Sequence, residues 1–151
     1  MPVYDEFSRV IDRTRVMLHR AVLAAEAIHD GSEVTVPMRA VLEFLRRDGE
    51  HTVSAIARAR SVSRQHIQVV VNDLLDLGLV ERIDNPQHRS APLIRLTTVG
   101  EACIDEMHRR ERDAFEPLLV GHPELSEERL RLAAAVVDEI GAVMAARREA
   151  S

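Results

Sequence analysis

Residues 52–98 read TVSAIARARSVSRQHIQVVVNDLLDLGLVERIDNPQHRSAPLIRLTT, and their pattern decides the fold. Apolar residues at helical spacing predict a short helix over Val53–Arg60 and a second over Ser63–Leu77, with a tight turn between them. Two β-branched runs follow, Leu79–Ile83 and Leu93–Thr98, joined by a polar loop. Helix, turn, helix and a two-stranded ribbon is the plan of the winged helix-turn-helix, which places its second helix in a DNA major groove.

The residue types at the expected helix crossing fit this plan. Two helices that cross closely need a small residue at the contact, and Ala57 stands at that position. Apolar side chains must face the core that the two helices share, and four occur at the required offsets: Ile56, Val62, Ile67 and Val70. We therefore expect all four to be buried.

The second helix is predicted to be amphipathic. Ser63 is suited to its N-cap, because a serine hydroxyl accepts a hydrogen bond from a free N–H of the first turn. The apolar stripe comprises Ile67, Val70, Val71, Leu74 and Leu75. The opposite face carries Arg64, Gln65, Gln68 and Asn72. These are residue types that read base edges, since arginine pairs with guanine and the amides pair with adenine.

Four motifs in this order resemble the MarR family of bacterial transcription regulators. They are Ser-Val-Ser-Arg ending at Arg64, the run Leu74–Arg82, the Asn85-Pro86 loop, and Leu96-Thr97-x-x-Gly100. The family usually carries Asp-x-Arg in the wing, where the carboxylate anchors an arginine that reaches DNA. This chain departs from that pattern, because His88 and Ser90 occupy the two positions and Arg89 lies between them.

The resemblance implies a mainly α fold: a winged helix-turn-helix with an α/β wing and flanking N- and C-terminal dimerisation helices. The DNA-binding lobe would be 36–98, and the helical dimerisation region would be 1–35 together with 99–151. It further implies a homodimer, more often a repressor than an activator, that binds a palindromic operator in double-stranded DNA. The residues expected to contact DNA are Ser61, Ser63, Arg64, Gln65, His66, Gln68 and Arg89.

The same resemblance implies control by a small ligand, often aromatic, bound between the dimer helices and the DNA-binding lobe. Met17, Met38 and Met107 are candidates to line such a pocket, although core packing explains them equally well. No catalytic residue, cofactor or metal is expected. The chain has neither a Gly-x-Ser-x-Gly elbow nor a glycine-rich phosphate loop, and its histidines lack the tight spacing of metal ligands.

Both ends of the chain predict apolar helices. Over Asp5–His29 a heptad-like seam runs beside a second apolar stripe, and a later helix begins after Ser126. The seam comprises Phe7, Ile11, Thr14, Leu18, Ala21, Ala25 and Ile28, and the second stripe Val3, Val10, Met17 and Ala24. A helix with two apolar faces favours a second subunit as partner, and the alternative is one wide core-facing stripe within a monomer.

Composition is that of a globular domain of 151 residues, with 46% hydrophobic and 30% charged residues. All 20 basic residues are arginine, which indicates a GC-rich bacterial genome. The net charge of −5 does not itself favour nucleic acid, so the local clustering of arginines in 52–98 carries that argument. No signal peptide or membrane span is expected, and one cysteine leaves the cytoplasm as the default compartment.

Two other functions stay open. Cys103 is a candidate redox sensor, although the sensing cysteine of one branch of the family lies in the first helix, where this chain has none. A winged helix also serves as a protein-interaction module without binding DNA. Salt separates the two kinds of interaction, because DNA binding through arginines weakens steeply as salt rises and an apolar protein contact does not.

Overall fold

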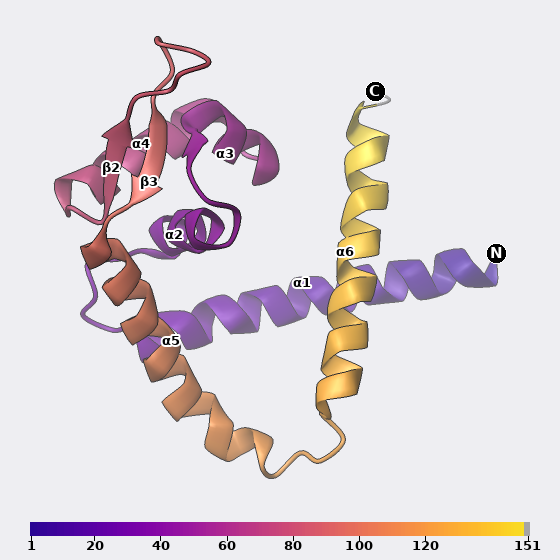
Figure 1. The fold of residues 1–151 in the computed structure, drawn as a ribbon. Coiled ribbons are helices and arrows are strands. Elements are labelled where there is room, and N and C mark those ends of the chain that lie inside the picture. The colour runs from indigo at the N-terminus through magenta and orange to yellow at the C-terminus, as the bar shows by residue number, and fades with distance from the viewer. Residues whose placement is uncertain (150–151) are drawn as a thin grey trace. The chain divides into compact units, whose positions relative to one another are not determined.

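The computed structural model describes residues 1–149 and is mainly helical, with a small antiparallel sheet (Figure 1). The predicted fold class is confirmed, and the helices lie within a few residues of their expected bounds. Residues 150–151, the end of the predicted helical region, lie outside the described residues. In chain order the elements are α1 (Pro2–Ile28), α2 (Val36–Asp48), β1 (His51–Thr52), α3 (Val53–Ala59), α4 (Arg64–Asp76), β2 (Val80–Ile83), β3 (Leu93–Leu96), α5 (Thr98–Leu119) and α6 (Glu127–Glu149).

The sheet has three strands, whereas the sequence predicted two. Strands β2 and β3 form the expected antiparallel ribbon, in which Arg82 is opposite Ile94. Strand β1 adds to the other edge of β3, with His51 opposite Ile94 and Thr52 opposite Leu93, so the strand order is β1-β3-β2. A strand of two residues has too few positions to show alternation, which explains why the sequence pattern did not reveal it.

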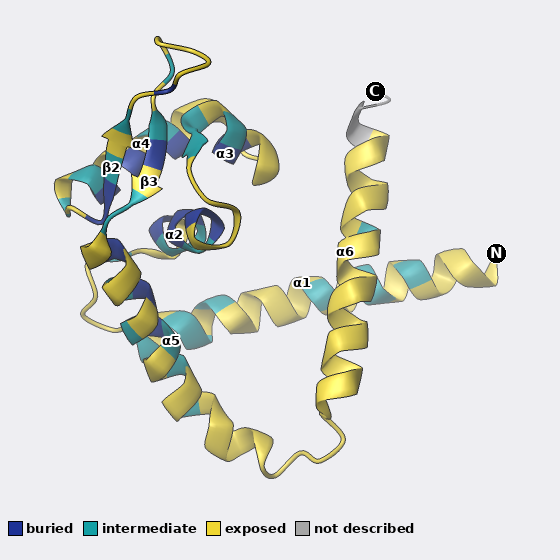
Figure 2. Cartoon of the chain, in the orientation of Figure 1, coloured by how far each residue is buried: buried dark blue, intermediate teal, exposed yellow. Residues whose placement is uncertain are grey.

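The core lies between α2, the helix-turn-helix, the sheet and the first half of α5, where Figure 2 shows the buried residues concentrated. Ile56, Ala57, Ile67 and Val70 are buried there, as the helix-crossing pattern predicted. The prediction for Val62 was wrong, because its side chain is 41% exposed.

The turn between α3 and α4 explains the exposure of Val62. Ser61 has a positive φ of 54°, and the amide of Val62 donates back to the carbonyl of Ala57 at 3.0 Å. This left-handed closure ends α3 and directs the chain away from the core before α4 begins. Helix α4 ends with the same kind of left-handed turn. Gly78 has a φ of 67°, and the amide of Leu79 donates to the carbonyl of Leu74 at 3.0 Å.

Contacts divide the chain into two compact units, Met1–Arg112 and Asp113–Ser151. The first contains α1 to α4, the sheet and most of α5, and the second contains the end of α5 and α6. The division expected from the sequence is by function and not by contacts. It assigns DNA binding to 36–98 and dimerisation to 1–35 and 99–151, and it stays a proposal.

Over residues 2–28 of α1 and 127–147 of α6, where the structure describes burial, no residue is completely buried in the single chain. On α1 the predicted seam is half-buried at Phe7 and Ile28 but exposed at Leu18. Several large apolar side chains of these two helices are exposed: Val3, Tyr4, Val16, Met17, Leu18, Leu23, Leu130, Leu132, Val136, Val137, Val143 and Met144. So many apolar side chains in water are unusual for a monomeric domain.

Candidate nucleic-acid interface

The first turn of α4 carries most of the residues expected to contact DNA. The hydroxyl of Ser63 accepts a hydrogen bond from the amide of His66 at 3.1 Å, which confirms Ser63 as the N-cap. Arg64, Gln65 and His66 follow directly and are all exposed. The N-terminus of a helix carries a partial positive charge, so this exposed turn is suited to lie near a phosphate backbone.

A hollow of about 220 Å³ joins this turn to the base of the wing. Arg64 and Gln68 of α4 and Arg82 of β2 lie on its wall, together with residues from the start of α3. Ser90 and Ala91 of the wing line it as well. Segments that are far apart in the sequence are therefore joined into one surface, with both polar and apolar side chains. Ser61, Gln65, His66 and Arg89 are exposed but do not line the hollow.

The wing loop between β2 and β3 is held by Asn85, which is only 8% exposed. Its Nδ2 donates to the carbonyl of Ala91 at 2.8 Å, and its Oδ1 accepts from the amides of Gln87 at 3.1 Å and His88 at 3.3 Å. One side chain thus ties both ends of the loop together. Arg89 lies in the exposed part of this closed loop. Asn85 provides the closure in a wing that has no Asp-x-Arg motif.

The arginines of the helix-turn-helix and wing differ in their partners. Arg95 donates to Glu81 at 2.6 Å, so a carboxylate in the same sheet neutralises its charge. That ion pair also raises the pKa of Arg95 above its usual value. Among residues 1–149, by contrast, nothing accepts a hydrogen bond from the side chain of Arg64 or Arg89, and neither forms an ion pair. Their charges are available to a phosphate or a base.

Gln68 and Asn72 do not simply face outward, as the helical pattern suggested. The Oδ1 of Asn72 accepts hydrogen bonds from Gln68 Nε2 at 3.0 Å and from Arg82 at 3.2 Å. Gln68 is half-buried, whereas Asn72 and Arg82 are exposed. These three side chains connect the recognition-helix face with strand β2.

A second cavity has a volume of about 290 Å³ and shares no lining residue with the hollow beside α4. It lies where the end of α1, the connector between α1 and α2, the start of α2 and Met107 of α5 meet. His29, Arg39 and Met107 are among its lining residues. Of the methionines considered from the sequence, Met107 therefore lines a cavity. Met38 and Met17 do not line this cavity: Met38 is buried in the core, as Met107 is, and Met17 is exposed on α1.

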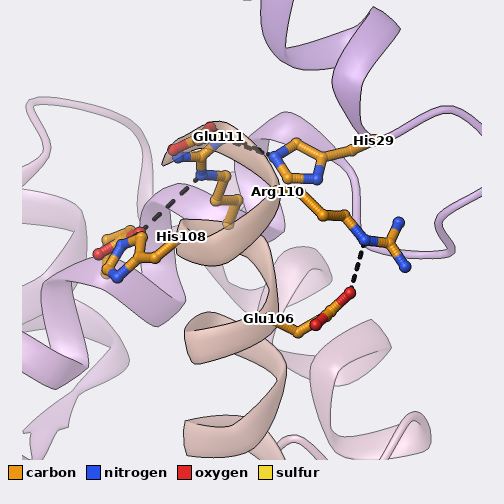
Figure 3. A network of polar contacts seen from close by, with 7 residues as sticks. His29, Glu106, His108, Arg110 and Glu111 are labelled. Atoms are coloured by element: carbon orange, nitrogen blue, oxygen red, sulfur yellow. Dashed lines mark hydrogen bonds and ion pairs between the residues drawn. The ribbon is translucent and has the colours of Figure 1, made fainter. Parts of the chain in front are cut away.

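The polar wall of this cavity is part of a network between α1, α2 and α5 (Figure 3). His29 Nε2 lies 3.2 Å from Glu111 Oε1, and Arg39 forms an ion pair with the same carboxylate. Nearby, His108 Nε2 lies 2.6 Å from Glu43. Burial raises the pKa of Glu111, but hydrogen bonds from Arg39 and His29 outweigh it and leave that pKa below its usual value.

His29 leaves one polar atom without a partner. Its side chain is only 8% exposed, and no group among residues 1–149 forms a hydrogen bond with its buried Nδ1. A buried polar atom without a partner is unfavourable and is often satisfied by a ligand or an ordered water. His29 and Arg39 both line the cavity, and the guanidinium of Arg39 has N–H donors in addition to the one that faces Glu111.

Cys103 lies in α5 and packs partly against the core. Burial raises the pKa of its thiol, and the positive charge of Arg110 offsets this only in part. A thiol with a raised pKa has less of the reactive thiolate at neutral pH. The environment of Cys103 is thus unlike that of a redox-sensing cysteine.

Sequence reasoning missed two residues of this surface. Asn85 was noted only as part of a loop motif, although asparagine before proline is a known signal for a side chain that caps its own turn. Arg82 belongs to the run Leu74–Arg82 and to the arginine cluster of 52–98, but it was not among the residues expected to contact DNA, and no local signal reveals that it reaches Asn72. Within residues 1–149 no helix is long and apolar enough to cross a membrane, and no three metal-binding side chains come together.

Comparison with known proteins agrees with this geometry. A model described as the MarR family matches residues 32–89. An uncharacterised protein of Mycobacterium tuberculosis, Rv2011c, is 42% identical over 59 residues, which are 39% of this chain and 41% of that protein. The match thus spans about two-fifths of the relative's length. The HTH-type transcriptional repressor IacR of Pseudomonas putida is 28% identical over 98 residues, 65% of this chain and 59% of IacR.

Solved structures share the fold over nearly the whole chain. The MarR family transcription regulator SP03579 has a TM-score of 0.72 and 26% identity, with 98% of this chain and 96% of that chain covered. FabT of Streptococcus pneumoniae, solved in complex with DNA, has a TM-score of 0.68 and 17% identity, with 91% and 96% covered. At that lower identity the likeness to FabT concerns the fold alone.

Proposed function

This chain belongs to the MarR family, and we propose that it is a cytoplasmic transcription regulator, a repressor that binds double-stranded DNA as a homodimer. The repressor IacR, with which it shares 28% identity, supports the proposed direction of control. The protein acts by binding and not as an enzyme.

The observation that carries the proposal is the unpaired charge on the exposed start of α4. Arg64 lies directly after the N-cap Ser63, is exposed, and has no side-chain partner among residues 1–149. An arginine in this position can form a bidentate contact with guanine in the major groove. Arg89 on the wing supplies a second free charge for phosphate or the minor groove.

The homodimer is proposed from the apolar side chains exposed on α1 and α6. Water covers these side chains in a single chain, and a second copy would bury them. A twofold dimer presents two α4 helices, so its operator would be palindromic, with half-sites about one helical turn apart. The state of assembly is measured by sedimentation at protein concentrations below and above those used for DNA binding.

Release of DNA by a small ligand is proposed from the cavity at His29. A small aromatic acid fits its chemistry, because Arg39 can pair with a carboxylate and the Nδ1 of His29 needs a partner. A ligand changes DNA affinity only if it binds the two conformations of the protein unequally. Addition of salicylate to the protein–DNA complex tests this part separately and is expected to lower the affinity for DNA. An unchanged affinity would contradict the proposed ligand and would leave the proposal of DNA binding unaffected.

DNA binding itself is tested by footprinting the full chain on the DNA that flanks its own gene. The protected region gives the target, its symmetry and its register in one measurement. Titration at increasing salt then follows, and a steep linear fall of log affinity against log salt is expected. If no duplex is protected at low salt, the chain is better described as a winged-helix module that binds protein.

A further inference from the structure

Arg82 of β2 carries a positive charge that no carboxylate offsets. Its guanidinium donates to the Oδ1 of Asn72 at 3.2 Å, and no other group among residues 1–149 accepts a hydrogen bond from its side chain or forms an ion pair with it. Asn72 is neutral, so the charge of Arg82 is held in place but is not cancelled. Arg95 on β3 differs, because Glu81 forms an ion pair with it at 2.6 Å.

The two faces of the ribbon explain this difference. Glu81 and Arg82 follow one another in β2, so their side chains lie on opposite faces of the sheet. Glu81 is in register with Arg95, and Arg82 is in register with the buried Ile94. The face of Arg82 and Ile94 lines the hollow beside α4, whereas Glu81 and Arg95 do not line it. The nearest acidic partner of the ribbon is therefore turned away from Arg82.

The hollow of about 220 Å³ contains cations and neutral donors. Its lining residues include Arg64 and Arg82, and none of them is an aspartate or a glutamate. Ser54 and Ser90 line it as well, and neither hydroxyl forms a hydrogen bond with another group among residues 1–149. Donors without a nearby carboxylate are suited to an anion. The hollow lies on the surface proposed to meet DNA, whose backbone carries phosphate.

We propose that this hollow binds one phosphate of the DNA backbone in each half-site, and that Arg82 is the residue that binds it. A guanidinium has five N–H donors in a planar fork, so the bond to Asn72 leaves donors for the two free oxygens of a phosphodiester. The hydroxyls of Ser54 and Ser90 can donate to the same group. The inference rests on the proposed DNA binding and adds a contact that positions the duplex without reading its sequence.

Asn72 would act as a positioning residue for this contact. An arginine side chain loses much of its rotamer freedom when a ligand fixes it. The hydrogen bond to Asn72 already restrains Arg82 in the free protein, so less freedom remains to be lost when phosphate binds. Asn72 does not line the hollow, which fits a role through Arg82 and not a contact of its own.

The first experiment measures the salt dependence of binding by the full chain. One duplex is selected from a random pool by the native protein, and a second of equal length and unrelated sequence serves for comparison. Each neutralised phosphate contributes about 0.9 to the slope of log affinity against log salt. Arg82→Ala should reduce the slope by about this amount per protomer. It should weaken both duplexes by similar factors, whereas Arg64→Ala should weaken mainly the selected one.

Two further variants control for charge. Arg82→Lys keeps the positive charge, so its slope should stay near that of the native protein. Arg95→Ala removes an equal charge from the same sheet, but from the face that does not line the hollow, and should also keep the slope. If Arg82→Ala and Arg95→Ala reduce the slope equally, only the net charge matters and the proposed contact is overturned.

The second experiment identifies the phosphate. Methylphosphonate, which has no charge, replaces one phosphate at a time in the selected duplex. At one position in each half-site it should weaken the native protein by roughly tenfold, the size of one hydrogen bond between charged groups. The same change should leave the affinity of Arg82→Ala unaltered, because the partner of that phosphate is already absent. Equal losses for both proteins at every position would contradict the contact.

The role of Asn72 is read at the position so identified. Asn72→Ala should lose less affinity there than the native protein does on replacement of the phosphate, and should match the native protein at the other positions. An undiminished loss at that position would contradict a positioning role for Asn72.

Stability and DNA binding are checked separately. Arg82 and Asn72 are exposed, so unfolding curves should show that every variant is folded. If the native protein binds no duplex at low salt, the proposed function fails together with this inference. If it binds DNA and Arg82→Ala keeps the native salt dependence, only this inference fails.

Discussion

Gly100 lies against the main chain of Leu79, so closely that a Cβ atom on Gly100 would be 2.0 Å from the Leu79 carbonyl oxygen. That oxygen accepts a hydrogen bond from the amide of Thr97 at 3.1 Å, and Thr97 also donates through its hydroxyl to Gly78 at 2.7 Å. The start of α5 is thus fixed against the end of the recognition-helix segment. The glycine of the Leu-Thr-x-x-Gly motif is required by this close approach.

Gly100→Ala is therefore expected to destabilise the protein by about 3 kcal/mol, the upper range for a forced overlap in a packed site. Urea unfolding followed by circular dichroism, at one protein concentration, measures the change. Gly141→Ala is the matched control, because a Cβ there meets nothing within 4 Å and alanine favours the helix by up to about 1 kcal/mol. Equal effects of the two substitutions would show that the contact with Leu79 is not what requires a glycine.

Glu111→Gln is expected to lower the free energy of unfolding by roughly 1–2 kcal/mol at neutral pH, since it removes charge-assisted hydrogen bonds with Arg39 and His29. The folded state lowers the pKa of Glu111 below the ordinary 4.5. The stabilisation is therefore complete above that value and is lost as the pH falls through the lower pKa of the folded state.

Urea unfolding between neutral and acidic pH measures the effect of Glu111. The native protein should lose stability on acidification more steeply than Glu111→Gln. Glu6→Gln is the control, because the Glu6–Arg9 pair is 65% exposed on both sides and should contribute almost nothing. If the free energy of unfolding falls equally with pH in the native protein and in Glu111→Gln, the role assigned to this carboxylate is contradicted.

Arg64→Ala should weaken binding to the footprinted duplex by tenfold or more, on the order of one bidentate base contact, and should leave thermal unfolding unchanged. Fluorescence anisotropy at fixed salt measures the affinity. Arg13→Ala removes one exposed arginine from α1 and controls for the loss of charge. Specific affinity that survives in Arg64→Ala would count against the assignment of α4 as the DNA-reading helix.

Asn85→Ala should open the wing loop, because three hydrogen bonds to the main chain are lost together. We expect DNA affinity to fall about as far as in Arg89→Ala, and less than in Arg64→Ala, since a wing contact is mainly to phosphate. The double variant Asn85→Ala/Arg89→Ala should be no weaker than Arg89→Ala alone. Additive losses would mean that Asn85 does not act through Arg89.

Cys103 should react slowly with a thiol reagent such as dithionitrobenzoate at neutral pH, because burial raises its pKa. Treatment with hydrogen peroxide should leave the DNA affinity of the native protein unchanged, as in a Cys103→Ala variant. Loss of affinity in the native protein alone would restore the redox-sensor interpretation.

Local pattern was sufficient for the helices and for the face that α4 exposes. Ile67, Val70 and Val71 recur at helical spacing, and Ser63 carries its own capping chemistry, so neither depends on distant residues. The exposure of Arg64 also follows from its place on the helix and not from distant residues. These features follow from interactions within one or two helical turns, which a single sequence displays directly.

Tertiary structure decided the contacts between segments. The pairing of β1 with β3, the bond from Arg82 to Asn72 and the meeting of His29 with Glu111, 82 residues apart, have no periodic signal. Val62 shows the limit of the pattern, because the positive φ of Ser61 moves an apolar residue out of the core. Such contacts depend on how packed elements bring side chains together, and only the folded chain specifies that geometry.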